Sequence, residues 1–545
     1  MISLVVLAAV ARLVGTAAAT QSDPLPLPPM GFNNWARFMT NINESIFVDA
    51  AEAMSKNGLL AAGYNRINLD DAWSTKERAA NGEMVWDPVK FPNGLPWLTA
   101  HLKSKGFIPG IYTDAGNVSC GGYPGALHHE EIDHETFTSW SFEYLKIDGC
   151  NMPDHSEATY HEVYGRWHEI LSGADHPMIL SDSAPAYFSG EIAGTNNMTD
   201  WYTVMGWASA YGQLARHSAD ILVYPDGIYG GGSSWVSMLY NYGQEVRLAR
   251  YQRPGYFNDP DFLNVDHPSY TLDEGKSHFA LWCSFSAPLI ISANIPALSQ
   301  EEIDYLTNKD LLAVNQDRLV QQATLVSSGQ TWDVLTKSLE NGDRLLTILN
   351  KGSSTGDLTV SWESIGLSSK ALRRANYVSA KNLWTGEQVK VSVKDGGITA
   401  KAIPSHGTAV FRIAKSISPV TPTGIIFNTN TTNCLTDNKS GHVTFAQCDG
   451  SDAQTWRVRP HGNINSLLRP DECIVDAQGA ILSRHSGCRT DAWTYELSGN
   501  LINNNSKLCL TEGANGAATA TSCGYELNEQ VVGLPVGVTV VGITV

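Results

Sequence analysis

Positive charge is scarce in this sequence of 545 residues. Lysine and arginine number 37 against 55 aspartates and glutamates, which gives a net charge of -18 and a pI near 5.2. So acidic a chain is not expected to bind nucleic acid or an anionic membrane surface. Beyond residue 20, no stretch reaches the ~18 apolar residues that a membrane span requires. The sequence therefore predicts neither nucleic acid nor a membrane as a partner.

Two ligand-binding signatures are also missing. No glycine-rich phosphate loop follows the first expected strand, so a nucleotide-binding fold is not indicated. Asp70 and Asp71 are adjacent carboxylates that would repel each other if both were buried without partners. Sugar hydroxyls with an Arg or Lys could hold them, and a divalent metal is the rival. Because no His or further carboxylate stands nearby at ligand spacing, we expect no metal.

The first residues have the features of a secreted protein. Leu4–Val14 is apolar and Ala17–Ala19 offer a small-residue cleavage site, although no Lys or Arg precedes the apolar run. Residues 1–20 are therefore predicted to be a signal peptide, and the protein to be extracellular. Six glycosylation sequons agree with a secretory route. Their asparagines are Asn43, Asn117, Asn197, Asn430, Asn438 and Asn504.

The nine cysteines divide unevenly along the chain. Cys120, Cys150 and Cys283 lie in the long first part, and six more follow residue 430. In an oxidising compartment the six are expected to form disulfides. Cys283 ends the apolar run Ala280–Cys283, so we expect it to be a buried free thiol.

Residues 24–318 alternate strand-like and helix-like segments. The expected strands are Met30–Asn34, Asn65–Asp70, Phe107–Tyr112, Tyr144–Asp148, Met178–Ser181, Leu214–His217, Tyr256–Asp259 and Pro288–Ser292. Amphipathic stretches such as Ile46–Asn57 and His155–Leu171 lie between them. Eight strands with intervening helices in just under 300 residues predict an α/β fold, a (β/α)₈ TIM barrel.

Candidate catalytic groups stand where these strands end, which is where a barrel of this type places its chemistry. Lys146 and Asp148 share one side of their strand, and an ammonium beside a carboxylate keeps it ionised, as a nucleophile requires. Arg216 and Asp220 would be an ordinary surface pair on a helix. If Asp220 instead lies on a loop after its strand, it can face Asp148. Two carboxylates across one cleft indicate glycoside hydrolysis.

Six segments together resemble the motifs of the retaining α-galactosidase (melibiase) family, glycoside hydrolase family twenty-seven. They are Met30–Trp35, Leu69–Trp73, Gly110–Asp114, Tyr144–Cys150, Asn258–Asp261 and Asn315–Asp317, in the family's order. The resemblance implies a (β/α)₈ barrel followed by an antiparallel β-domain, with no metal or organic cofactor. Many members carry Cys where this chain has Ala72, so one disulfide of the family is expected to be missing.

The resemblance also implies roles for individual residues. Asp148 would be the nucleophile that forms a glycosyl ester, and Asp220 the general acid and then the base. Cys120 and Cys150 would form a disulfide that ties two active-site loops together. The implied sugar-contacting residues are Phe32, Asp70, Asp71, Tyr112, Lys146, Ser183, Ala186, Tyr187, Arg216 and Asp261.

Ser183 and Ala186 bear on the substrate. By the family resemblance, the α-galactosidases of animals have a larger Glu and Leu at these two positions. Those side chains close the pocket around the 2-hydroxyl of the sugar. The related α-N-acetylgalactosaminidases place Ser and Ala, as this chain does. A roomy pocket accepts both sugars, because pockets reject by volume more strongly than they attract. The alternative is that a neighbouring loop refills the space.

The C-terminal third has no helical pattern. Residues 319–415 alternate strand-like runs with Gly- and Asn-containing turns, which predicts an antiparallel β-sandwich. A Pro/Ser/Thr-rich linker is expected at 416–422. Residues 423–545 repeat at spacings of 39 and 36, each repeat with one predicted short disulfide. The pairs are Cys434 with Cys448, Cys473 with Cys488, and Cys509 with Cys523.

This last segment resembles the ricin-type β-trefoil lectin family, through Gln454–Trp456 and its weaker copies Asp491–Trp493 and Gln530–Val532. Family sites usually carry an Asp two residues after the first Cys of a repeat. Here Thr436, Val475 and Thr511 stand instead, with Asp437 and Asp476 one residue further on. Since a shift of one residue turns a side chain to the other face of a strand, both a working lectin and a purely structural trefoil remain open.

Taken together, the sequence predicts a secreted retaining exo-glycosidase. Its expected substrates are terminal α-galactosides or α-N-acetylgalactosaminides of oligosaccharides, polysaccharides or glycoconjugates. The alternative is a galactose-binding protein whose barrel has lost catalysis. The presence of both Asp148 and Asp220 argues against that loss.

Overall fold

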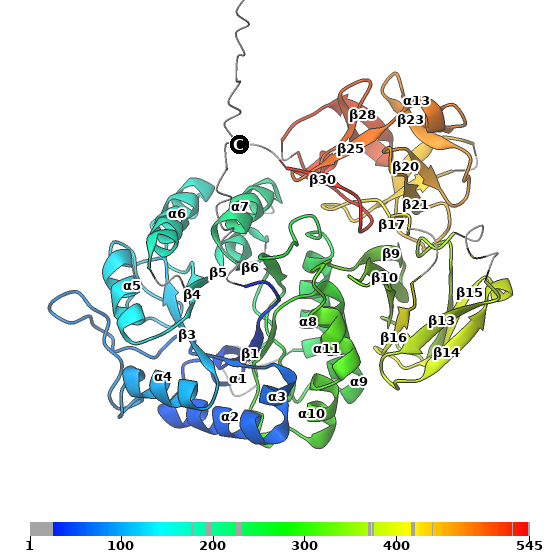
Figure 1. Ribbon diagram of the computed structural model, residues 1–545. Coiled ribbons are helices and arrows are strands. Elements are labelled where there is room, and N and C mark those ends of the chain that lie inside the picture. The colour runs from blue at the N-terminus through cyan, green and yellow to red at the C-terminus, as the bar shows by residue number, and fades with distance from the viewer. Residues whose placement is uncertain are drawn as a thin grey trace, which may run out of the picture.

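The computed structural model describes residues 25–175, 178–190, 198–224, 232–368, 372, 375–415, 420–438, 440–525 and 527–542. Three bodies are visible in Figure 1: a barrel wrapped by helices, an antiparallel β-domain beside it, and a third β-rich body above both. The expected signal peptide, the sequon at Asn197 and residues 416–419 of the expected linker lie outside the described residues.

The barrel consists of eight parallel strands, ordered β7-β6-β5-β4-β3-β2-β1-β8. Each overlaps one expected strand, so the predicted fold class is confirmed. Leu263, which follows β7, pairs with Ile291 at the end of β8 and closes the ring. The strands are β1 Met30–Asn33, β2 Arg66–Asn68, β3 Ile108–Asp114, β4 Tyr144–Asp148, β5 Ile179–Asp182, β6 Leu214–Arg216, β7 Phe257–Asp259 and β8 Leu289–Ile291.

The helices wrap the barrel and bury one apolar face each. In α2, Asn43 caps the first turn by accepting a hydrogen bond from Ile46 N, and Gly58, with a φ of 94°, ends the helix. Its buried face, which includes Phe47 and Met54, recurs at the spacing expected of an amphipathic helix. The helices are α1 Trp35–Phe38, α2 Glu44–Asn57, α3 Leu59–Ala62, α4 Leu95–Ser104, α5 Glu130–Ser139, α6 Glu157–Gly173, α7 Met198–Tyr211, α8 Ser234–Glu245, α9 Leu272–Phe285, α10 Gln300–Leu306 and α11 Lys309–Asn315, with 3₁₀ turns η1 Ala184–Phe188 and η2 Ile295–Ala297.

The second body is antiparallel, as expected. A six-stranded sheet, ordered β14-β13-β16-β11-β10-β9, accompanies the two-stranded sheet β12-β15, and apolar side chains from both fill one core. The strands are β9 Thr324–Ser328, β10 Trp332–Ser338, β11 Arg344–Asn350, β12 Gly356–Ser361, β13 Tyr377–Asn382, β14 Gln388–Ser392, β15 Gly397–Ile403 and β16 Thr408–Ile413, with the 3₁₀ turn η3 Val393–Asp395.

The third body is built of short strands, and each of its three sequence repeats holds one disulfide. The pairs Cys434–Cys448, Cys473–Cys488 and Cys509–Cys523 form as expected, and Cys283 is free and buried in the barrel. The elements are β17 Thr423–Ile425, β18 Phe427–Asn428, β19 Cys434–Asp437, β20 Val443–Ala446, β21 Thr455–Val458, β22 Ile464–Ser466, β23 Cys473–Ala477, β24 Ala480–Arg484, α13 Gly487–Thr490, β25 Trp493–Glu496, β26 Leu501–Asn503, β27 Leu508–Glu512, η4 Ala514–Gly516, β28 Ala518–Ser522, η5 Asn528–Gln530, β29 Val532–Gly533 and β30 Val540–Val541.

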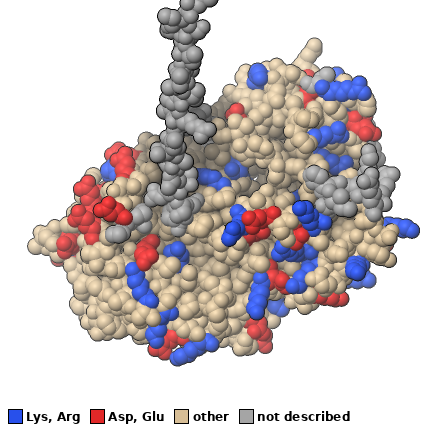
Figure 2. Space-filling view, viewed as in Figure 1, with Lys and Arg blue, Asp and Glu red and all other residues tan. Residues whose placement is uncertain are grey.

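The surface carries few charges. Most of the face seen in Figure 2 bears neither basic nor acidic side chains, in keeping with a charged content of 17%. Among the described residues, no helix is both long and apolar enough to cross a bilayer. Of the described sequon asparagines, Asn43, Asn117, Asn430 and Asn504 are exposed and Asn438 is half-buried.

Candidate active site

Asp148 ends strand β4, and two neighbours fix its carboxylate. Tyr187 OH donates a hydrogen bond of 2.6 Å to Oδ1, and Lys146 Nζ lies 3.9 Å from Oδ2. Its side chain is 17% exposed, so solvent and a small ligand can reach it. An accessible carboxylate that two neighbours hold at the end of a barrel strand has the arrangement of a nucleophile.

Lys146 lies between Asp148 and the paired carboxylates of β2. Its Nζ is 2.8 Å from Asp70 Oδ2, which also accepts from Asn33 Nδ2 at 2.8 Å. Burial acts to lower the pKa of Lys146, but Asp70 and Asp148 outweigh it and raise that pKa, so the ammonium stays charged. The donors that hold the Asp70 carboxylate are therefore the protein's own side chains, Lys146 and Asn33.

Asp71 is held by a different set of donors. Ser119 Oγ donates to Oδ1 at 2.8 Å, and the backbone N–H of Gly121 donates to Oδ2 at 2.6 Å. Desolvation by burial raises the pKa of Asp71, and these hydrogen bonds oppose the shift. Because Ser119 and Gly121 flank Cys120, Asp71 couples the loop after β2 to the disulfide-bearing loop after β3.

Asp114 is a buried carboxylate beside Asp148 whose structural role the sequence did not reveal. Strands β3 and β4 pair in parallel with Asp114 opposite Asp148. Its Oδ2 accepts from Cys150 N at 3.0 Å, and its Oδ1 from Gly116 N at 2.8 Å. Burial, followed by the charge of Asp148, raises the pKa of this fully buried carboxyl well above its ordinary value. Asp114 thereby fixes the chain that follows the nucleophile.

Cys120 and Cys150 form the expected disulfide beside these groups. Tyr187 OH lies 3.2 Å from Cys150 Sγ, so the ring that holds Asp148 also rests against the bridge. Within the described residues, Asp114 with these two sulfurs is the one grouping of possible metal ligands. The sulfurs are bonded to each other and offer no thiolate.

Asp220 lies on the loop after β6, not on a helix with Arg216. Arg216 Nη2 donates to its Oδ1 at 2.9 Å, and Trp35 Nε1 donates to its Oδ2 at 2.9 Å. Its side chain is 52% exposed, whereas that of Arg216 is 5% exposed. Arg216 also donates to Asp261 Oδ1 at 2.9 Å, so one guanidinium serves two carboxylates.

The two carboxylates that share Arg216 have pKa values shifted in opposite directions. Desolvation acts to raise the pKa of Asp220, but Arg216 and Lys146 hold it below its ordinary value. Burial raises the pKa of Asp261 to about 7, with Arg216 opposing the shift. In the unliganded site, therefore, Asp220 is ionised over a wider pH range than Asp261.

Ser183 and Ala186 stand at the end of β5, next to Tyr187. Ser183 is buried and its Oγ has no hydrogen-bond partner among the described residues. Ala186, in the 3₁₀ turn η1, is also buried, and its N–H donates to Ser183 O. The chain therefore places both small residues within one turn of the side chain that holds Asp148.

Phe32 does not line the site, which corrects one expectation. Side chains alternate along a strand, and Asn33 points to Asp70, so Phe32 faces the opposite side. There it is fully buried against Phe47 of α2, with ring centroids 6.3 Å apart. Trp35 contacts Asp220 instead, and it was already part of the Met30–Trp35 motif.

The trefoil aspartates that were candidate sugar ligands are used internally. Asp437 is fully buried, pairs with Arg469 and accepts from Ser466 Oγ at 2.6 Å. Asp476 caps its own turn by accepting from Gly479 N at 2.7 Å. Thr436 accepts a hydrogen bond from the Gln454 amide. These contacts favour a structural use of these positions.

The site as a whole combines a reachable carboxylate on β4, a second carboxylate after β6, and buried Lys and Arg groups that bind oxygen atoms. Two carboxylates at one end of a (β/α)₈ barrel, with cationic side chains beside them, form the arrangement found in glycoside hydrolases.

Comparisons with known proteins agree with that class. Three family models match the chain: α-galactosidase A at residues 27–317, the α-galactosidase C-terminal β-sandwich domain at 329–413, and the ricin-type β-trefoil lectin domain at 422–531. The chain therefore belongs to the α-galactosidase A (melibiase) family, with a ricin-type trefoil appended.

Relatives extend over nearly the whole chain. An α-galactosidase A of Aspergillus niger is 52% identical over 530 residues, which cover 95% of this chain and 93% of that protein. An α-galactosidase of Cyamopsis tetragonoloba is 34% identical over 385 residues, 70% of this chain and 85% of that protein. The crystal structure of α-galactosidase I from Mortierella vinacea matches with a TM-score of 0.63 and 25% identity, over 73% of this chain and 100% of that one.

Proposed function

We propose that this protein is a secreted exo-glycosidase that releases terminal α-galactosyl groups by double displacement. The observation that carries the proposal is the placement of Asp148: at the end of β4, reachable, and held by Tyr187 and Lys146. The α-galactosidase named among the relatives, 52% identical over almost the full length, supports the choice of sugar. The four disulfides are typical of an oxidising compartment and support secretion.

The reaction then takes two steps. Asp148 attacks the anomeric carbon to form a galactosyl ester, while Asp220 gives a proton to the departing glycosidic oxygen. Asp220 next takes a proton from water, and the resulting nucleophile attacks the same carbon, frees galactose and restores Asp148. Each step inverts the anomeric centre, so the product keeps the α configuration.

Buried donors and acceptors supply the sugar contacts. Lys146 is held by Asp70, and Arg216 by Asp261, so both cations need little rearrangement when sugar hydroxyls bind. Preorganised polar groups in a partly dry site are worth more than the same groups in water. Tyr112, Asp71 and Asp261 complete this polar wall.

The small residues Ser183 and Ala186 support acceptance of a 2-acetamido group as well. Both lie within one turn of Tyr187, and their short side chains fill less space than the Glu and Leu of the animal α-galactosidases. We therefore extend the proposal to α-N-acetylgalactosaminides as substrates of the same pocket.

The test compares kcat/KM for nitrophenyl α-galactoside and nitrophenyl α-N-acetylgalactosaminide, and records the anomer released first by NMR. We expect turnover of the galactoside, α-galactose as first product, and measurable turnover of the acetamido substrate. Release of β-galactose would refute double displacement. Turnover of the galactoside alone would refute the extension. If neither is hydrolysed while sugar still binds, the protein is a galactose-binding lectin.

A further inference from the structure

A large cavity lies between the barrel and the trefoil, outside the site described above. Its volume is about 1160 Å³, slightly above the ~300–1,000 Å³ of ordinary small-ligand sites, so it has room for a ligand of several rings. The barrel contributes α6, α7 and the segment Val246–Arg253 between α8 and β7. The trefoil contributes Tyr495, Tyr525 and residues 533–540. None of the proposed catalytic or sugar-contacting residues is among its described lining residues.

The two walls of this cavity are joined by direct contacts. Arg250 Nε of the barrel donates to Leu497 O at 2.9 Å, and Val536 N donates at 2.7 Å to Oγ1 of Thr324, which begins β9 of the antiparallel domain. Tyr202 OH and Thr429 Oγ1 share a short hydrogen bond across the same junction. The cavity is therefore preformed, and a ligand would not have to close it.

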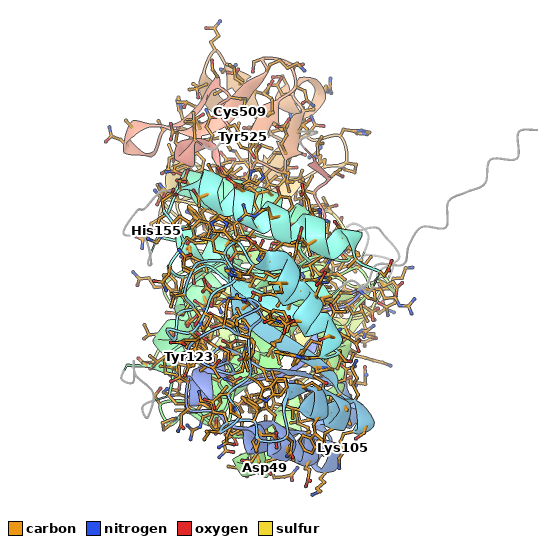
Figure 3. The ribbon with its side chains drawn as sticks, turned by 90° about the vertical axis from the view of Figure 1, so that its left-hand side faces the viewer. Asp49, Lys105, Tyr123, His155, Cys509 and Tyr525 are labelled. Carbon is orange, nitrogen blue, oxygen red and sulfur yellow. A yellow bond between two sulfur atoms is a disulfide. The ribbon has the colours of Figure 1, made fainter. Side chains whose placement is uncertain are left out.

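Aromatic rings line both walls. Tyr525 is 55% exposed on the trefoil side, and in Figure 3 it lies at the trefoil's lower edge, facing the barrel helices. Trp207 of α7 is half-buried on the barrel side, with Nε1 donating to Glu157 Oε1 at 2.8 Å. Aromatic side chains that line a preformed cavity suit the C–H faces of sugars.

Arg247 adds an unused donor group. It lines the cavity, and its guanidinium forms no ion pair with a carboxylate of any residue that the structure describes. In a chain of net charge -18, an arginine that finds no carboxylate leaves donors for a ligand. The carboxylate of Glu157 lines the same cavity, so both charge signs are present, which fits a neutral ligand rich in hydroxyl oxygens.

We propose that this cavity is a second carbohydrate-binding site, which holds the neutral sugar chain that carries the α-galactosyl groups. The identity of that chain rests on the proposed function; the binding itself does not. The cavity runs along the outer side of α7 and reaches Gln252 and Arg253, which precede β7, whereas the catalytic carboxylates follow strand ends. The site therefore anchors the enzyme to a polymer and does not extend the catalytic pocket.

The test measures retardation of the full-length protein during native electrophoresis through gels that contain galactomannan. An Asp148→Asn background prevents consumption of the polymer, and saturating galactose fills the catalytic pocket. We expect retardation to persist under these conditions, and Tyr525→Ala or Arg247→Gln to weaken binding about fivefold or more each. Tyr377→Ala is the matched control, because Tyr377 of β13 is 60% exposed but does not line the cavity.

A variant that fills the cavity with a larger side chain separates loss of binding from loss of folding. Ala210 is exposed on α7 and lines the cavity, so Ala210→Trp should abolish retardation while nitrophenyl α-galactoside is still hydrolysed at the parent rate when Asp148 is intact. Retardation that survives all three cavity variants, or that galactose alone abolishes, overturns the proposal. So does retention by a polyuronate gel but not by galactomannan. Failure to hydrolyse the nitrophenyl substrate would count against the proposed function instead.

Discussion

Replacing Asp182 by Asn should make the protein more stable at neutral and alkaline pH. Asp182 ends β5 and is fully buried. Its Oδ1 accepts from Ala184 N at 2.7 Å, whereas its Oδ2 has no partner among the described residues. Burial raises the pKa of this carboxyl from 3.8 to about 7. The folded protein therefore favours the neutral form.

The sign and size of the effect follow from linkage. Between pH 4 and 7 the folded state keeps a proton on Asp182 that the unfolded chain has lost, so stability falls as the pH rises. The contribution is fully present below the unfolded pKa and is lost once the pH passes the folded one. A shift of about three pKa units corresponds to on the order of 4 kcal/mol. Asn stays neutral, keeps an acceptor for Ala184 N, and avoids this loss.

The assay is urea unfolding, followed by tryptophan fluorescence, of wild type and Asp182→Asn at pH 4.5, 6 and 8. The free energy of unfolding of the variant relative to wild type should rise by several kcal/mol across this range and level off above pH 7. Asp395→Asn, at an exposed position in η3, should show a difference close to zero at every pH. A difference for Asp182→Asn that does not change with pH would refute the assignment of a buried, neutral carboxyl.

Three changes near the proposed catalytic carboxylates test how they are held. Tyr187→Phe removes the 2.6 Å hydrogen bond to Asp148 and should lower kcat about 10- to 100-fold, with galactose affinity nearly unchanged. Replacing both Cys120 and Cys150 by Ser should abolish activity at a temperature at which the far-ultraviolet circular dichroism spectrum is still native. If activity and the native spectrum are lost at the same temperature, the disulfide does not act locally on the active-site loops. Trp35→Phe removes a donor that lowers the pKa of Asp220, so the basic limb of kcat/KM should move to higher pH; an unmoved limb would count against Asp220 as the acid.

The barrel and the position of Asp148 at a strand end could be predicted because their signals are local. Eight apolar runs separated by amphipathic stretches indicate where the strands lie along the chain, and Lys146 and Asp148 are two residues apart on one strand. Local periodicity is the strongest signal in a single sequence. The trefoil disulfides follow likewise from a repeat that is visible without coordinates.

Residues whose role depends on a distant partner were harder to assign. Asp114 was visible at a strand end, but its contact with Cys150 N depends on the pairing of β3 with β4. The family motif implies a sugar contact for Phe32 but does not state which face of β1 the side chain occupies, and the structure packs it against Phe47. The Asp437–Arg469 ion pair joins residues 32 apart. In each case one residue of register or one long-range contact decides the function.

The pKa of Asp220 has to rise before it can act as an acid, and the substrate is the agent best placed to raise it. In the unliganded site Arg216, Lys146 and Trp35 all stabilise the ionised form. A bound galactoside excludes water from the 52% exposed carboxylate and takes up donors of Arg216 and Lys146, and both changes favour protonation. The basic limb of kcat, which reports the complex, should therefore lie at higher pH than that of kcat/KM, which reports the free enzyme. Full pH profiles with nitrophenyl α-galactoside measure both limbs. Coincident limbs, or a kcat limb at lower pH, would show that Asp220 is protonated by some other route.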